Sequence, residues 1–169
     1  MLAVAALVAT AAPHTAEPST KRIVAAARLE TQVAARVNLV RRWHGLPPLR
    51  SSRGLAAAAR RHSREMGSKG YFEHESASGT AFWRRIERTY GSRGFERWEV
   101  GENIAWNTAR ATAVDVVRQW MRSPGHRANV LSRTWRDLGL GAFRVRRAAG
   151  TYGGRTVTIV TLDLGVRAR

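Results

Sequence analysis

The fold and the candidate site depend on one stretch in the second half of the chain, Trp120-Met121-Arg122-Ser123-Pro124-Gly125-His126-Arg127-Ala128-Asn129-Val130-Leu131. Ser123 and Pro124 predict a helix start, because serine suits the N-cap and proline suits the first helical position, where its missing N–H costs nothing. A short helix through His126 to Leu131 is expected to follow. A histidine beside a helix start, in a segment with glycine and serine, can point its ring into a cleft. His126 is therefore a candidate site residue.

Helical patterns precede this stretch. Val33, Val37 and Val40 recur at the spacing of one buried helical stripe. In a second segment, residues 52–68, the face with apolar spacing also carries His62. We expect helices over residues 23–43, 52–68, 80–90 and 112–122, the last with Val114, Val117 and Met121 on one face.

The end of the chain changes character. Leu138, Leu140 and Ala142 alternate with polar or glycine positions, and residues 156–164 are rich in β-branched side chains. Residues 150–154, which contain three glycines, separate the two segments, so an antiparallel hairpin is expected. Residues 91–100 have a loop composition, and a brief extended segment is expected after them. Helices first and strands last favour an α+β fold with a helix-flanked antiparallel sheet.

Length and composition limit the class of protein. A chain of 169 residues suits one domain with a short leader. Hydrophobic residues make up 44% and charged residues 24%, which excludes wholesale disorder. Because the sequence has no cysteine, disulfides, thiolate zinc sites and a cysteine nucleophile are excluded. We expect a single, monomeric domain over residues 23–169.

The first 22 residues read as a signal-peptide-like leader and linker. Residues 1–12 are apolar, with an A-x-A-like pattern at Ala9-Thr10-Ala11. This run is shorter than the roughly 20 apolar residues that span a bilayer, and the sequence predicts no transmembrane segment. We therefore expect a secreted protein, extracellular or associated with the cell envelope.

The net charge of +17 raises the question of a nucleic-acid partner. Two of the 29 basic residues are lysine, Lys21 and Lys69, which leaves 27 arginines, and these are scattered along the chain. No nucleic-acid-binding motif is present, so no specific nucleic-acid partner is expected. We expect instead a basic surface that adheres to anionic cell-envelope polymers or lipid head groups.

Two further residues are candidates for a site. His74 lies in an irregular segment, and Glu102 lies among apolar residues in Gly-Glu-Asn. A carboxylate in an apolar neighbourhood needs donors, and a histidine is the economical partner. Their separation from each other and from His126 matches no metal-motif spacing. His44, at a helix end, and His62, on an apolar face, are better explained as structural residues.

Six segments resemble, in order, the motifs of the CAP superfamily (cysteine-rich secretory, antigen 5 and pathogenesis-related proteins, or SCP-like domains), bacterial type. They are residues 38–49, 55–66, 71–79, 101–105, 120–131 and 137–141. The resemblance implies an α-β-α sandwich with a central antiparallel sheet. It also implies a cleft in which His74 and His126 match the two histidines of a His/Glu/Glu/His tetrad and Glu102 matches the first glutamate. Ser123 stands where the second glutamate is expected.

The resemblance leaves three functions open. CAP relatives are reported to bind zinc or magnesium, sterols, lipids and glycans. In the first reading, His74 and His126 hold Zn²⁺ or another divalent cation in a cleft supported by Asn103 and Ser123, which also takes a small lipid or glycan of the envelope. In the second, Glu102 is the general base of a zinc hydrolase.

The third reading is a purely structural His/Glu cluster. A tryptophan-rich surface would then do the binding. Trp83 and Trp98, nearest the variable loops, are the candidates for an exposed rim.

Overall fold

The computed structural model describes residues 22–108 and 110–169, so the expected leader lies almost wholly outside it. The helices and strands follow in this order: β1 (Ile23–Ala25), α1 (Ala27–Trp43), β2 (Arg50–Ser51), α2 (Arg53–Lys69), α3 (Phe82–Glu87), β3 (Arg97–Thr108), α4 (Ala113–Arg122), α5 (Pro124–Leu131), β4 (Asp137–Val145), the 3-10 helix η1 (Gly150–Tyr152) and β5 (Val157–Ala168). Within the described ranges, no helix has the length and apolar character needed to cross a membrane.

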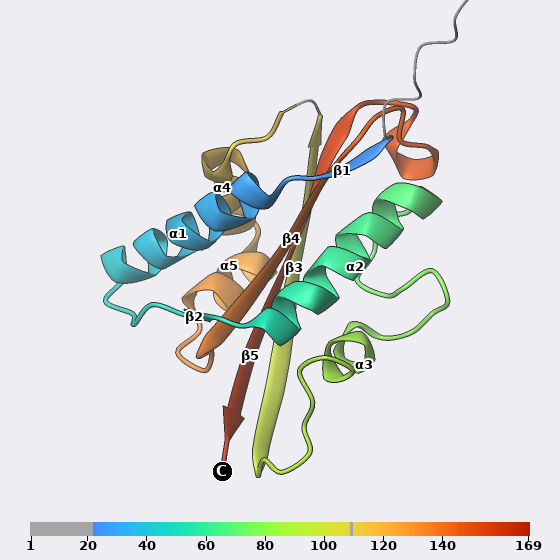
Figure 1. The fold of residues 1–169 in the computed structure, drawn as a ribbon. Helices are drawn as coiled ribbons and strands as arrows, with labels where there is room; N and C mark the ends of the chain where they lie inside the picture. The colour runs from blue at the N-terminus through green and yellow to red at the C-terminus, as the bar shows by residue number, and fades with distance from the viewer. Residues whose placement is uncertain (1–21, 109) are drawn as a thin grey trace, which may run out of the picture.

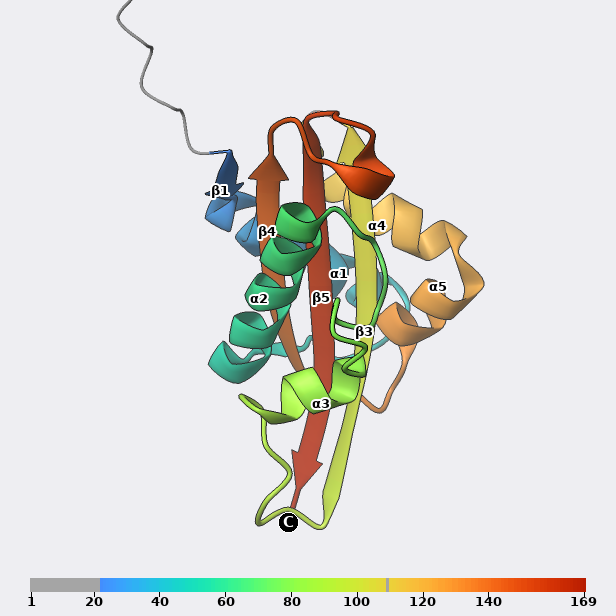
Figure 2. The same cartoon turned by 90° about the vertical axis from the view of Figure 1, so that its right-hand side faces the viewer.

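The elements form three layers. The central sheet has the strand order β1-β4-β5-β3, and each of these neighbours is antiparallel. The two residues of β2 add a short parallel pairing to the start of β4. Helices α1, α4 and α5 lie on one side of the sheet, and α2 and α3 lie on the other (Figures 1 and 2). This arrangement confirms the expected α-β-α sandwich.

The larger core lies between the sheet and α1, α4 and α5. The predicted stripe of Val33, Val37 and Val40 is buried there. The predicted face of α4 was partly wrong, because Val114 is exposed and Trp120 is buried. The Trp120 indole N–H donates to the backbone oxygen of Ile104 in β3 (3.1 Å), and this contact fixes the side of α4 that meets the sheet.

Helix α2 lies directly on the opposite face of the sheet. A Cβ at Gly139 would overlap main-chain atoms of Leu55 and Ala56, and one at Gly141 would overlap the backbone of Ala59. Glycines at these two β4 positions therefore allow the helix backbone to approach the strand. The approach brings the inward face of α2, including the fully buried His62, against the sheet.

Two predicted boundaries were wrong. Residues 23–25 form an edge strand paired with residues 143–145 of β4, so the first helix begins at Ala27. The extended segment expected near Glu102 is a strand of 12 residues that pairs with β5 along its whole length. In both places, pairing with the sheet determines a structure that the local composition does not indicate.

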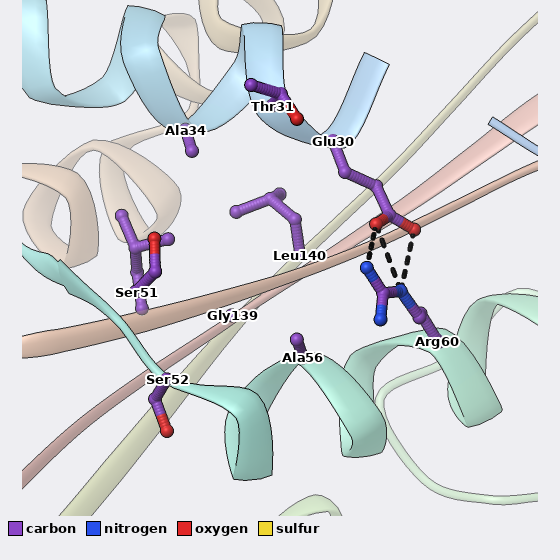
Figure 3. A pocket seen from close by; sticks show the side chains of 10 residues that line it. Glu30, Thr31, Ala34, Ser51, Ser52, Ala56, Arg60, Gly139 and Leu140 are labelled. Atoms are coloured by element: carbon purple, nitrogen blue, oxygen red, sulfur yellow. Dashed lines mark hydrogen bonds and ion pairs between the residues drawn. The ribbon is translucent and has the colours of Figure 1, made fainter. Parts of the chain in front are cut away.

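A cavity of about 200 Å³ lies beside β4, between α1 and α2. Glu30 and Arg60 line it and are bonded directly to each other, as Figure 3 shows, with Arg60 Nε 3.0 Å from Glu30 Oε2. Glu30 Oε1 also accepts a hydrogen bond from the backbone N–H of Ala142 (3.1 Å). This cavity lies beside β4, towards the β1 side of the sheet, whereas the candidate site described next lies at β3, the opposite edge.

Candidate functional site

Glu102 lies in the middle of β3, and its side chain is 1% exposed. It is directly opposite Asp163 of β5, so the two carboxyl groups share the face of the sheet that α2 and α3 cover. Strand β3 is at the edge of the sheet, and groups from both helical layers can therefore meet beside Glu102. The strand supplies a rigid base for the site.

Arg85 of α3 is the buried partner of Glu102. Its guanidinium donates to Glu102 Oε2, and its other terminal nitrogen donates to the backbone oxygen of His74 (3.1 Å). Only 6% of its side chain is exposed. Nothing in the sequence singles out Arg85, because α3 carries Arg84 and Arg85 side by side and composition does not distinguish which one points inward.

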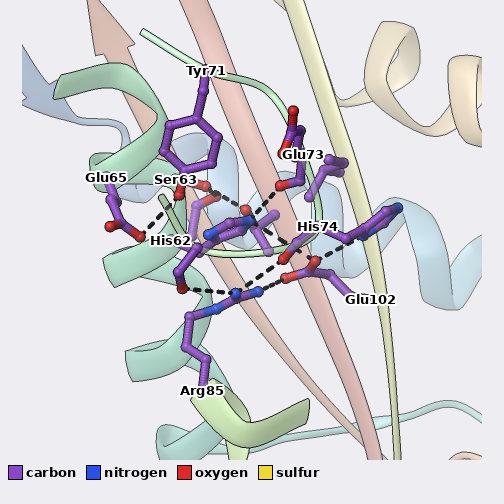
Figure 4. Close-up of polar contacts among 12 residues, drawn as sticks. His62, Ser63, Glu65, Tyr71, Glu73, His74, Arg85 and Glu102 are labelled. Carbon is purple, nitrogen blue, oxygen red and sulfur yellow. Dashed lines mark hydrogen bonds and ion pairs between the residues drawn. The ribbon is translucent and has the colours of Figure 1, made fainter. Parts of the chain in front are cut away.

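His74 contacts the other oxygen of the same carboxylate. Its Nδ1 lies 2.8 Å from Glu102 Oε1, and 41% of its side chain is exposed (Figure 4). An ionised carboxylate only accepts hydrogen bonds, so Nδ1 carries the proton and Nε2 is the free nitrogen of the neutral ring. The hydrogen bond to Glu102 raises the pKa of His74 above its ordinary value.

Both oxygens of Glu102 are therefore occupied. Burial alone would raise the pKa of Glu102, but the hydrogen bond from His74 and the charge of Arg85 outweigh it and lower the pKa. An ionised carboxylate that already accepts a hydrogen bond at each oxygen and has almost no solvent exposure is placed to orient His74. It is poorly placed to take a proton from water.

His126 approaches the site from the other helical layer. Its ring centroid lies 6.2 Å from that of His74. Burial, followed by the charge of His74, lowers the pKa of His126, which favours its neutral form. The structure thus brings together the three residues selected from the sequence, with His74 beside both Glu102 and His126.

Two asparagines hold the helix that carries His126. The Asn103 side-chain amide donates to the His126 backbone oxygen (3.0 Å). The Asn129 amide donates to Asn103 Oδ1 (2.9 Å) and to the Glu102 backbone oxygen (3.2 Å). Asn103 therefore ties β3 to the helix that carries His126, and Asn129 strengthens the same connection. Ser123 is the N-cap residue of α5, but its hydroxyl makes no capping hydrogen bond.

Two buried groups line the inner side of the site. His62 Nε2 lies 2.9 Å from the Glu73 backbone oxygen and 3.9 Å from Glu102 Oε1, and burial lowers the pKa of His62. Burial and the neighbouring Glu102 carboxylate raise the pKa of Asp163 well above its usual range. Burial thus disfavours the charged forms of both His62 and Asp163. Asp163 was not selected from the sequence, because it lies in an apolar, β-branched strand. Its neighbours give no sign that Glu102, 61 positions earlier, lies opposite it in the sheet.

The arrangement offers two nitrogen ligands for a cation. No group of three or more His, Asp or Glu side chains suited to a metal occurs among residues 22–108 and 110–169. Two imidazole nitrogens that bind one zinc ion at about 2.0–2.1 Å place their ring centroids roughly 5–6 Å apart. The ring centroids of His74 and His126, 6.2 Å apart, lie just beyond this range. The Glu102 contact fits the carboxylate that supports a metal-binding histidine.

The expected tryptophan rim is found only in part. Trp83 is 41% exposed. Trp98 is half-buried, and its indole N–H donates to the Tyr90 backbone oxygen (2.7 Å), so its assignment to an exposed rim was wrong. Trp43 is the most exposed tryptophan in the described part of the chain, at 65%, and Arg36 stacks on its ring.

Similar proteins were found by sequence. Two relatives from Bacillus subtilis (strain 168) are each 34% identical to the chain. The uncharacterized protein YkwD matches over 143 residues, which are 79% of this chain and 51% of the relative. The uncharacterized membrane protein YlbC matches over 115 residues, 68% of this chain and 32% of the relative. The chain thus spans about half, or less, of these relatives.

Solved structures share the fold. An extracellular protein containing an SCP domain, from Bacillus anthracis, has a TM-score of 0.63 at 27% identity, covering 85% of this chain and 41% of that one. An outer surface protein of Borrelia burgdorferi has a TM-score of 0.69 at 17% identity, covering 86% and 97%. The model of the cysteine-rich secretory protein family, CAP, matches residues 34–162. The chain, although it has no cysteine, therefore belongs to the CAP family.

Proposed function

We propose that this domain binds a divalent cation, with zinc favoured, through Nε2 of His74 and a ring nitrogen of His126. The observation that carries the proposal is the arrangement of the two rings, 6.2 Å apart, with Glu102 fixing the tautomer of one of them. Two neutral imidazoles suit zinc, and the remaining coordination positions would be open to water or to a ligand. The cleft would then present the cation to a small lipid or glycan of the cell envelope.

Secretion is part of this proposal. The apolar run in residues 1–12 supports it, as do the extracellular and surface proteins among the structural neighbours. We do not assign a hydrolase activity to the cleft, because both oxygens of Glu102 are engaged by Arg85 and His74. The proposed role is binding.

The test is a calorimetric titration of the metal-free protein with ZnCl₂. Wild type should bind about one zinc ion per chain, and His74→Ala and His126→Ala should abolish saturable binding. Glu102→Gln should weaken it by about 10- to 100-fold, the usual effect of losing a supporting carboxylate. His44→Ala is the matched control, since His44 is exposed at the end of α1 and its Nδ1 contacts the Val40 backbone oxygen.

The affinity should also depend on pH. Because the pKa of His74 is raised, protons compete with the cation, and zinc should bind more weakly as the pH falls from 8 to 6. Equal affinity in wild type, His74→Ala and His126→Ala would show that these histidines do not form the site.

A further inference from the structure

A second cavity, of about 340 Å³, lies between α2, α3 and the loop that joins them. Arg61 lines it from α2, Arg85 from α3 and Arg88 from the end of α3. Its volume is near the lower end of the range of about 300–1,000 Å³ typical of small-ligand pockets. The cavity is therefore of a size to enclose a small polar molecule.

The positive charge of this cavity is not balanced by the chain. Arg61 and Arg88 are exposed, and neither side chain makes a hydrogen bond or ion pair with the rest of residues 22–108 and 110–169. Glu65 is the one acidic residue that lines the cavity, and its two oxygens accept from Lys69 Nζ (2.9 Å) and Tyr71 OH (2.9 Å). Two arginines are left to attract an anion.

The third wall of the cavity supplies hydroxyl groups in an ordered turn. The Ser76 N–H donates to the Thr80 backbone oxygen (2.9 Å), and the Gly79 N–H donates to the Ser76 backbone oxygen (2.8 Å). Gly79 has φ of +75°, which favours glycine and closes the turn. Ser76, Ser78 and Thr80 all line the cavity, with the last two hydroxyls 2.9 Å apart.

Arg85 connects this cavity to the zinc-binding cleft proposed above. It lines the cavity, its guanidinium donates to Glu102, and one of its nitrogens lies 3.5 Å from the Ser76 hydroxyl. Its charge is neutralised by Glu102, so the net positive charge of the cavity comes from the two unpaired arginines. The cavity wall is held in place by the same contacts that hold His74.

We propose that this cavity binds the phosphate group of a small phosphorylated or phosphodiester ligand. Guanidinium groups donate paired hydrogen bonds to phosphate oxygens, and serine and threonine hydroxyls donate to the remaining ones. The volume leaves room beside the phosphate for a glycerol or sugar unit. The site does not need a metal, and so it is independent of the zinc site.

The experiment is a titration of the full chain with glycerol 3-phosphate and with inorganic phosphate, at low salt and in EDTA. Wild type should show saturable binding. The double variant Arg61→Gln/Arg88→Gln should bind at least about 10-fold more weakly, because it loses two charge-assisted contacts. The matched control is Arg122→Gln/Arg133→Gln, which removes the same charge from exposed arginines outside the cavity and should bind within about 2-fold of wild type.

Vesicles containing phosphatidylglycerol distinguish the source of the phosphate. Vesicle binding that requires Arg61 and Arg88 and is displaced by glycerol 3-phosphate identifies a lipid head group. Binding of glycerol 3-phosphate without such vesicle binding identifies a soluble ligand. Equal weakening of the two double variants, or no saturable phosphate binding by wild type in EDTA, would overturn the proposal. Either result leaves the zinc titration unaffected.

Discussion

Replacing Arg85 by methionine tests whether the buried ion pair organises the candidate site. The substitution keeps most of the side-chain volume and removes the one cation bonded to Glu102 Oε2. It also removes the donor to the His74 backbone oxygen. Glu102 would then be a carboxylate, 1% exposed, whose main remaining partner is His74.

The burial of Glu102 determines how much stability Arg85→Met should lose. Removing one partner of a buried ion pair leaves an uncompensated charge and typically costs about 3–5 kcal/mol of unfolding free energy. Because a chain of this size loses about 2–4 °C of melting temperature per kcal/mol, Arg85→Met should melt roughly 6–20 °C below wild type. Arg84→Met, at an exposed position on the same short helix, should stay within about 0.5 kcal/mol of wild type.

The assay is urea denaturation followed by circular dichroism at pH 7. The double variant Arg85→Met/Glu102→Gln removes both charges and should recover part of the loss, with a coupling energy of about 1–3 kcal/mol. The reasoning would be refuted if Arg85→Met cost less than about 1 kcal/mol, or if the double variant lost the sum of the two single losses.

Two other predictions follow from the same face of the sheet. Gly139→Ala should destabilise the fold by at least about 1–3 kcal/mol, because its Cβ would overlap the α2 backbone, whereas Gly125→Ala, with open space at its Cβ, should be neutral; similar melting temperatures would contradict this. Asp163→Asn should be more stable than wild type at pH 7–8. A carboxyl group whose pKa is raised in the folded state lowers the stability of the protein as the pH rises from the unfolded-state pKa, about 3.9, towards the folded-state pKa. The stability advantage of Asp163→Asn over wild type should therefore shrink as the pH falls towards 4. A pH-independent difference in unfolding free energy would exclude a protonated Asp163.

The sequence predicted those parts of the fold that have a strong local signal. The valine stripe of α1, the apolar face of α2 and the Ser-Pro start of α5 all appear where expected. The strand β1 did not, because three residues with helical neighbours become a strand only through pairing with β4. The order of the strands likewise depends on contacts between distant segments, which no local pattern contains.

The residues of the candidate site were likewise predicted only in part from the sequence. His74, Glu102 and His126 lie in short motifs that can be recognised in the sequence, and the structure places them together. Arg85 and Asp163 lie in an ordinary helix and an ordinary strand, where only the register of the sheet and the rotation of α3 bring them to Glu102. Residues that balance the charge of a buried group are therefore harder to predict from the sequence than site residues that lie in a recognisable motif.

That charge balance would allow a protein with a large positive charge to present the cation site proposed above. Glu102 and Arg85 neutralise each other, while burial lowers the pKa of His62 and raises the pKa of Asp163, which disfavours the charged form of each. The imidazole in the cleft whose charged form is favoured is His74, whose pKa is raised by Glu102 and whose ring is partly exposed. When His74 is protonated, the cleft repels a cation; when it is neutral, Nε2 becomes available. At the proposed site, cation binding would be linked to the release of one proton from His74, and Glu102 would control both by holding Nδ1 of the same ring.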